Sequence, residues 1–276
     1  MSSVGGLDRQ LTDDEVADIA AKHERARQSV KPIRRITLDH PLMTIDDAYA
    51  CQTAWINLQL AHGSRVGGHK IGLTSKAMHQ AVNIDEPDFG TLLDYMFIPN
   101  GAALNAADFC DPKLEVELAF VLKSGLAGDQ VTAADVLAAT DYVVAAAELI
   151  DARSHRVDPV DKVSRTVRDT ISDNAANAGI VVGNVHRAPT DGDLRWVGAI
   201  LNRNGEVEET GLAAGVLGDP VQGIVWLARR FARYGMVLEP GQVILAGSFT
   251  RPVGCRAGDS FHIEFGPLGN LDLSFT

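Results

Sequence analysis

The sequence of 276 residues predicts an α+β protein, in which a helical N-terminal part precedes a β-rich body. Two capping boxes, each opening a helical stretch, lie within the first 65 residues or so. After the Gly67-Gly68 pair, short apolar runs alternate with Gly, Pro, Asn and Asp, as is typical of strands and turns. Strands outnumber helices without alternating strictly with them, which disfavours a doubly wound sheet. We expect an α-rich region over residues 1–66 and a β-rich domain over residues 67–276.

Four helices are expected from the residues that cap their first turns. A Thr or Asp side chain in this position accepts a hydrogen bond from a backbone N–H that has no partner within the helix. The capping pairs are Thr12 with Glu15, Thr44 with Asp47, Thr132 with Asp135, and Asp219 followed by Pro220. From these starts the helices are expected to reach about Arg27, Leu60, Ala139 and Phe231.

Nine strands are expected from short apolar or alternating runs bounded by turn residues. They span residues 69–73, 114–122, 142–150, 180–182, 196–202, 207–210, 242–246, 260–265 and 270–275. Asn204-Gly205 stands between two of these runs, and both residue types accept the positive φ that a two-residue hairpin turn requires. The sequence therefore predicts a hairpin at this point.

Composition and charge exclude several classes of function. The chain has 25 basic and 36 acidic residues, a net charge of −11, which argues against binding to nucleic acid. Its three cysteines, Cys51, Cys110 and Cys255, lack CxxC spacing and so fit a reducing compartment better than a disulfide framework or a zinc site. The N-terminus has no apolar core of a signal peptide, and the most apolar run, 143–150, is too short to cross a bilayer. We expect a cytoplasmic protein.

The strand over residues 114–122 carries two acidic side chains on one face. Period-two alternation puts Leu114, Val116, Leu118 and Phe120 on one side and Glu115 and Glu117 on the other. The Cα atoms of the two glutamates are then roughly 6–7 Å apart. Two such carboxylates repel each other unless a cation lies between them. The alternative is a half-exposed strand with two solvated acids.

Glu148 lies in a segment that is otherwise fit for burial, residues 143–150. An ionised carboxylate in such a place requires a cation or several hydrogen bonds, and a salt bridge to an Arg or Lys is one way to meet this need. Convergence of Glu148 with Glu115 and Glu117 would instead form an all-oxygen site. Such ligands suit Mg²⁺ or Mn²⁺.

Several further polar residues are candidates for binding or catalysis. Lys70 lies in a short strand between glycines, which permit close approach of a ligand, and could bind a carboxylate or move a proton. Asp88, in a turn-like loop over residues 86–90, could act as an acid or base. Candidate substrate-binding residues are Ser172 and Asn174 before one strand, Ser248, Thr250 and Arg251 after another, and Arg153. Arg153 and His155 compete with Arg251 for the binding of a second substrate carboxylate. Capping, turn formation and surface exposure are the alternatives for all of them.

Five blocks in order resemble the hydratase branch of the fumarylacetoacetate hydrolase superfamily. They are HKIGLTSK (69–76), EVELAFVL (115–122), ELIDAR (148–153), TISDNAANAG (170–179) and GSFTRP (247–252). The resemblance runs from about residue 34 to the C-terminus. It implies a mixed β-sandwich or roll as catalytic body, a smaller α-rich N-terminal part, and a homo-oligomer.

The resemblance also implies a reaction and its residues. Family members bind Mg²⁺ or Mn²⁺ through three acids that align with Glu115, Glu117 and Glu148, while Lys70 and Asp88 align with residues proposed for proton transfer or substrate binding. The implied activity is metal-dependent addition of water to a 2-hydroxy-2,4-dienoate, which gives a 4-hydroxy-2-oxo acid. The candidate arginines suggest a dicarboxylate substrate. The alternatives are a 4-oxalocrotonate-type decarboxylase, a non-catalytic partner of one, and, more weakly, an acylpyruvate hydrolase.

Overall fold

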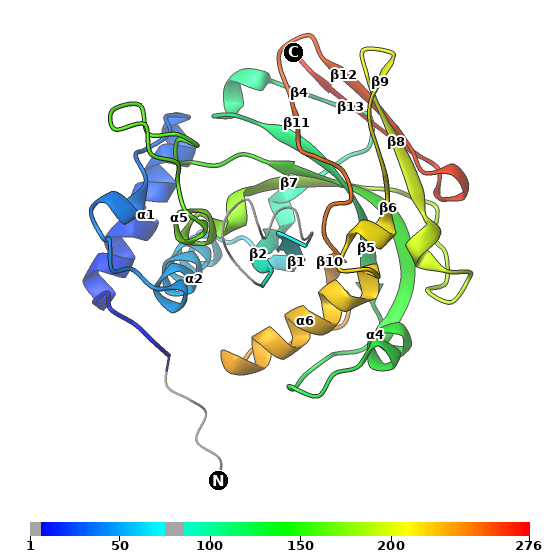
Figure 1. Cartoon of the computed structure of the whole chain (residues 1–276), viewed down its shortest axis with the longest axis horizontal. Helices are drawn as coiled ribbons and strands as arrows, with labels where there is room; N and C mark the ends of the chain where they lie inside the picture. The colour runs from blue at the N-terminus through cyan, green and yellow to red at the C-terminus, as the bar shows by residue number, and fades with distance from the viewer. Residues whose placement is uncertain (1–6, 75–85) are drawn as a thin grey trace.

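Two packed β-sheets form the body of the molecule, and the N-terminal helices lie at one end of it (Figure 1). The computed structural model describes residues 7–74 and 86–276. In that part of the chain the helices are α1 (Asp13–Ser29), α2 (Ile45–Ala61), α4 (Ala133–Ala139), α5 (Val167–Ser172) and α6 (Pro220–Arg233). The α+β class that the sequence predicts is confirmed.

The larger sheet has the strand order β2-β1-β10-β5-β6-β7-β3, and β11 pairs with β5 beside this path. Its strands are β1 (Val66–Gly72), β2 (Asp88–Leu93), β3 (Phe97–Ile98), β5 (Lys113–Leu122), β6 (Thr140–Ile150), β7 (Asn177–Val182), β10 (Val243–Leu245) and β11 (Val253–Gly254). The smaller sheet has the order β4-β13-β12-β8-β9. It consists of β4 (Ala102–Leu104), β8 (Gly198–Arg203), β9 (Glu206–Leu212), β12 (Ser260–Glu264) and β13 (Asn270–Phe275).

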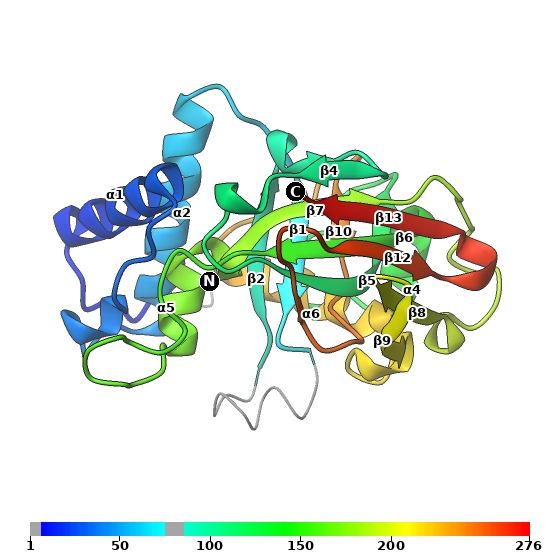
Figure 2. The ribbon, with the colours of Figure 1, turned by 90° about the horizontal axis from the view of Figure 1, so that it is seen from above.

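The main core lies between the two sheets, and in Figure 2 strands β12 and β13 of the smaller sheet are seen in front of the larger sheet. Val116 and Leu118 of β5 belong to the same buried cluster as Phe261 of β12 and Leu273 of β13. The alternation along β5 therefore turns its apolar side chains toward the smaller sheet. The glutamates of β5 lie on the opposite face, beside a smaller apolar cluster that includes Ala119 and Ala146.

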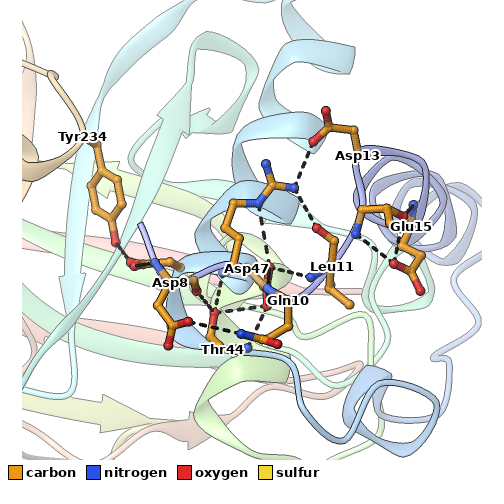
Figure 3. Close-up of polar contacts among 11 residues, drawn as sticks. Asp8, Gln10, Leu11, Asp13, Glu15, Thr44, Asp47 and Tyr234 are labelled. Atoms are coloured by element: carbon orange, nitrogen blue, oxygen red, sulfur yellow. Dashed lines mark hydrogen bonds and ion pairs between the residues drawn. The ribbon is translucent and has the colours of Figure 1, made fainter. Parts of the chain in front are cut away.

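The capping predictions for the helices are confirmed. Thr12, Thr44 and Thr132 each form a capping box, and Asp219 caps α6 with Pro220 in its first turn. The residues before α1 are held against the start of α2, because Asp47 accepts hydrogen bonds from the backbone N–H groups of Gln10 and Leu11 (Figure 3). The pair of helices thus forms one unit beside the sheet.

Several strand predictions need correction. Residues 86–90 do not form a turn-like loop, because Asp88 begins the buried strand β2, which pairs antiparallel with β1. Leu73 lies beyond β1 in a left-handed conformation, and Trp196 belongs to a 3₁₀ turn before β8. Strands β2, β3, β4 and β11 and helix α5 have no counterpart among the predicted elements. The predicted hairpin is present: Asn204 and Gly205 have positive φ and join β8 to β9. Residues 75 and 76 of the first sequence block lie outside the described residues.

His69 is buried between the larger sheet and α6, and this makes stability depend on pH. Its ring packs edge-on against Phe231 at 4.7 Å between centroids. Burial lowers the pKa of His69 to about 3, from an ordinary value of 6.5, although a backbone hydrogen bond with Gly90 opposes the shift. The unfolded chain therefore binds the proton more readily than the folded protein, and stability that is fully present above pH 6.5 falls as the pH drops toward 3.

We expect His69→Gln to remove part of the acid sensitivity of the fold. As the pH drops below 6.5, the free energy of unfolding of the wild type should decrease more steeply than that of the variant. The difference is at most about 1.4 kcal/mol per pH unit. Urea unfolding between pH 7.5 and 4.5 measures the difference. His62→Gln, at an exposed position, is the control. Parallel pH profiles of the wild type and His69→Gln would contradict the assignment.

Candidate metal centre

Strands β5 and β6 bring three glutamates together. In their antiparallel register Glu115 lies directly opposite Glu148, and Glu117 is two residues further along the same face of β5. One carboxylate oxygen from each of the three lies within 4.8 Å of the others. Glu117 and Glu148 are buried and Glu115 is half-buried. The cluster predicted from the sequence is thus formed by the fold.

Two of these carboxylates each use one oxygen for protein contacts and leave the other without a partner. Glu148 Oε1 accepts a hydrogen bond from Asn177 Nδ2 at 2.9 Å and lies 3.2 Å from Lys70 Nζ. Glu117 Oε2 accepts one from the backbone N–H of Gly247 at 2.8 Å. Among the described residues, Glu148 Oε2 and Glu117 Oε1 have no hydrogen-bond partner although they are buried. Oriented oxygens of this kind, with no thiolate or imidazole among them, fit a hard divalent cation.

The cluster is electrostatically unfavourable without a cation. Burial raises the pKa of Glu115 to about 8, and the neighbouring Glu148 adds to this effect. Burial also raises the pKa of Glu117, and both other glutamates contribute. Lys70 supplies one positive charge, so the salt bridge considered for Glu148 does exist. Among the described residues, however, the Lys70 ammonium is the one that forms an ion pair with any of the three carboxylates, and a bound divalent ion would relieve the remaining repulsion.

Lys70 is held in the centre of this group by β1. It is buried and pairs in register with Gly90 of β2 and Leu245 of β10. Burial alone would lower the pKa of Lys70, but the charges of Glu148, Asp88 and the other two glutamates outweigh it and raise that pKa above its ordinary value. Lys70 is therefore a cation surrounded by carboxylates, within reach of any molecule that the centre binds.

Asp88 lies at the start of β2, opposite Gly72 of β1. Its side chain is buried, and Oδ1 has no hydrogen-bond partner among the described residues. A Cβ atom on Gly72 would lie 2.3 Å from this oxygen and 3.3 Å from Lys70 Nζ, so glycine is needed for the close approach. Burial raises the pKa of Asp88 to about 6, while Lys70 acts in the opposite direction. Such a group can exchange a proton near neutral pH.

The loop after β10 is attached to β5 between the two glutamates. Val116, which separates Glu115 from Glu117, donates its backbone N–H to Thr250 Oγ1 at 3.2 Å. Its carbonyl accepts a hydrogen bond from Ser248 Oγ at 3.3 Å. Ser248 and Thr250 are therefore brought to the metal centre, and both hydroxyl groups already take part in protein hydrogen bonds.

Ser172 is the last residue of α5 and Asn174 lies between α5 and β7, and both are fully buried. Ser172 Oγ donates to the carbonyl of Asp169, and the carboxamide of Asn174 bonds both the N–H and the carbonyl of Thr91 in β2. The contacts of Asn174 join this segment to the strand that carries Asp88. Both side chains are thus engaged in hydrogen bonds within the protein.

Both candidate arginines have carboxylate partners within the chain. Arg153 is buried and its guanidinium bonds Asp173, while Arg251 is exposed and bonds Glu209 of β9 at 2.8 Å. His155 contributes a backbone N–H to the carbonyl of Ile33. The contacts of these residues do not include the three glutamates. The sequence predicts no separate role for Asn177. The feature that could have indicated one is a polar residue at the start of a buried strand.

Comparison with known proteins places the chain in a family. No family model matches it. It is 51% identical over 257 residues, which is 93% of this chain and 96% of the relative, to the 2-oxo-hept-4-ene-1,7-dioate hydratase of Escherichia coli. It is 36% identical over 265 residues to the 2-keto-4-pentenoate hydratase of Paraburkholderia xenovorans, covering 96% of each chain.

Solved structures agree with this relationship. The structure of 4-oxalocrotonate decarboxylase from Pseudomonas putida G7, complexed with magnesium and adipate, has a TM-score of 0.92 at 32% identity and covers 98% of this chain and 100% of its own. A fumarylacetoacetate hydrolase family protein from Yersinia pestis shares the fold alone, with a TM-score of 0.56 and 15% identity over 75% of this chain and 92% of its own. The chain belongs to the family of these 2-oxo-4-enoate hydratases, and it shares its fold with fumarylacetoacetate hydrolase family proteins.

Proposed function

We propose that this protein is a divalent-metal-dependent hydro-lyase that adds water to a 2-hydroxy-2,4-dienoate, of the 2-oxo-hept-4-ene-1,7-dioate type, in the breakdown of aromatic compounds. The observation that carries the proposal is the cluster of Glu115, Glu117 and Glu148, in which two buried carboxylates each keep one oxygen that no other described residue bonds. The 51% identity to a hydratase of that substrate supports the choice of reaction.

The three glutamates would hold the ion, Mg²⁺ or Mn²⁺. When bound, such an ion supplies Lewis-acid stabilisation of the negative charge that develops on the 2-oxygen of the substrate. The backbone N–H of Gly247 fixes Glu117, and Lys70 and Asn177 fix Glu148, so the carboxylates are oriented before a ligand arrives. Such preorganisation lowers the cost of reorganisation during the reaction.

Lys70 and Asp88 are the groups that we assign to proton transfer. Asp88, whose pKa is raised by burial to about 6, can take a proton from water or return one to carbon. Lys70 can hold the substrate carboxylate or donate a proton to the dienol. We assign substrate binding to Ser172, Asn174, Ser248, Thr250, Arg153 and Arg251, with the arginines as candidates for a distal carboxylate.

A 4-oxalocrotonate decarboxylase activity is the second candidate. It is favoured by the magnesium-bound decarboxylase structure that covers 98% of this chain at a TM-score of 0.92. Decarboxylation and hydration both pass through a dienolate or enolate, so the same glutamates and Lys70 would serve either reaction. The higher identity to the hydratase, 51% against 32%, makes hydration the first choice.

One assay distinguishes hydration from decarboxylation. Purified protein with Mg²⁺ is incubated with 2-hydroxyhepta-2,4-diene-1,7-dioate, with 2-hydroxypenta-2,4-dienoate and with 4-oxalocrotonate. We expect the ultraviolet absorbance of the first dienoate to disappear fastest, without release of CO₂, and EDTA to stop the reaction. Release of CO₂ from 4-oxalocrotonate would support the decarboxylase instead. Turnover of none of the three would contradict both enzyme assignments and favour a non-catalytic partner of a decarboxylase.

The remaining parts of the proposal concern assembly and location. We expect a homo-oligomer, and a pathway decarboxylase as a further partner. None of the described helices combines the length and apolar character that crossing a membrane requires. A cytoplasmic location is supported by Cys51, Cys110 and Cys255, which are all free thiols.

A further inference from the structure

Asn177 connects the metal centre to the rest of the larger sheet. It is the first residue of β7, and its side chain is fully buried. Its Nδ2 donates to Glu148 Oε1 at 2.9 Å, the oxygen that Lys70 Nζ approaches at 3.2 Å from β1. Two donors from strands on opposite sides of β6 therefore hold one oxygen of Glu148. The other oxygen, Oε2, has no partner within the described chain.

The backbone that leads into Asn177 adopts an unusual conformation. Asn174, Ala175 and Ala176 are all left-handed, with φ of 51°, 49° and 59°. For residues with a side chain this costs roughly 1–2 kcal/mol each. Strained segments persist only where the surrounding contacts determine them, and they concentrate at functional sites. Here Ala176 accepts a hydrogen bond from Asp151 N–H at 2.8 Å, and the carboxamide of Asn174 bonds both backbone groups of Thr91.

Arg153 completes the support of this turn. Its Nη1 donates to the carbonyl of Asn177 at 2.8 Å, while its Nε and Nη2 bond the side chain and the carbonyl of Asp173. The guanidinium thus bridges the left-handed turn, from Asp173, which precedes the turn, to Asn177, which follows it. Because Arg153 is buried and engaged on three nitrogens, its contacts fix the position of Asn177.

We propose that Asn177 is a positioning residue of the metal centre, which holds the Glu148 carboxylate so that Oε2 stays available to the ion. This inference rests on the proposed metal-dependent function. A carboxamide suits the place, because its N–H₂ is a neutral donor that satisfies Oε1 without adding charge beside Lys70. Without it, Lys70 alone would determine the orientation of Glu148. Groups that orient a metal ligand in this way commonly contribute about 10–100-fold to metal affinity.

The test is the affinity for the metal alone. Isothermal titration of Mg²⁺ and of Mn²⁺ into Asn177→Ala and Asn177→Leu should give a Kd about 10–100-fold weaker than in the wild type. The leucine variant preserves the volume of the side chain and removes the donor. Asn202→Leu is the matched control, because Asn202 Nδ2 donates to Glu264 Oε1 at 3.1 Å in the smaller sheet. The control should bind both ions as the wild type does.

The outcomes separate this inference from the proposed function. A wild type that binds neither ion contradicts the metal-dependent function itself. A wild type that binds, together with Asn177 variants whose Kd lies within twofold of its value, overturns the role of Asn177 alone. If the variants fold poorly in EDTA, the rise of Tm along a Mg²⁺ titration reports the same affinity. If the Tm of the variants reaches half of its rise at the same Mg²⁺ concentration as in the wild type, the inference is overturned.

Discussion

Glu148→Gln is expected to abolish binding of the divalent cation and, with it, turnover. The substitution keeps the size of the side chain but replaces one oxygen by an N–H₂ group. The remaining carbonyl oxygen cannot serve both the ion and the two donors, Lys70 and Asn177, that now bond Oε1. We expect Mg²⁺ to bind more than about 100-fold more weakly, since loss of a supporting contact alone costs up to that much. Turnover should fall by about 1000-fold or more.

Thermal unfolding with and without Mg²⁺ gives a second measurement for Glu148→Gln. The Tm of the wild type should rise with Mg²⁺ concentration, because the ion binds the folded protein, whereas that of the variant should not. Glu264→Gln is the control, because Glu264 is another strand glutamate that accepts a hydrogen bond from an asparagine. A Glu148→Gln variant with wild-type turnover at limiting Mg²⁺ would contradict the metal model, even if the protein is an enzyme.

The candidate ligand set could be predicted from the sequence because each glutamate has an informative position within its strand. Glu115 and Glu117 repeat at the strand period, and this period alone places them on one face of β5. Glu148 interrupts an apolar run, which signals a buried charge in need of a partner. The register of β5 with β6 was beyond sequence reasoning, because it depends on pairing between residues about thirty positions apart.

Strand β2 and the arginine contacts show where local reasoning ends. Pro87, Asp88 and Gly90 are turn formers by propensity, yet tertiary pairing with β1 makes this segment a buried strand. The contact of Arg153 with Asp173 could not be predicted either, because the two residues lie twenty positions apart and only the fold brings them together. Propensity reports the preference of a segment, whereas a long-range partner decides what a buried polar side chain does.

Lys70→Met is expected to separate chemistry from metal binding. The variant keeps an unbranched side chain of similar length but removes the charge that lies 3.2 Å from Glu148 Oε1. Turnover should fall by about 10²–10⁴-fold, the usual contribution of a positioned proton-transfer group. The affinity for Mg²⁺ should be retained or increase, because the variant removes a cation that competes for the same carboxylates.

This opposite effect on the two measurements distinguishes Lys70 from the glutamates. Titration calorimetry with Mg²⁺ and steady-state kinetics on the same preparation provide both values. Lys123→Met is the control, since Lys123 is exposed just beyond the end of β5. If Lys70→Met lost Mg²⁺ binding together with turnover, Lys70 would act as a structural support of the site and the proton-transfer role would be wrong. Retained Mg²⁺ binding without turnover is the result expected of a group that acts on the substrate.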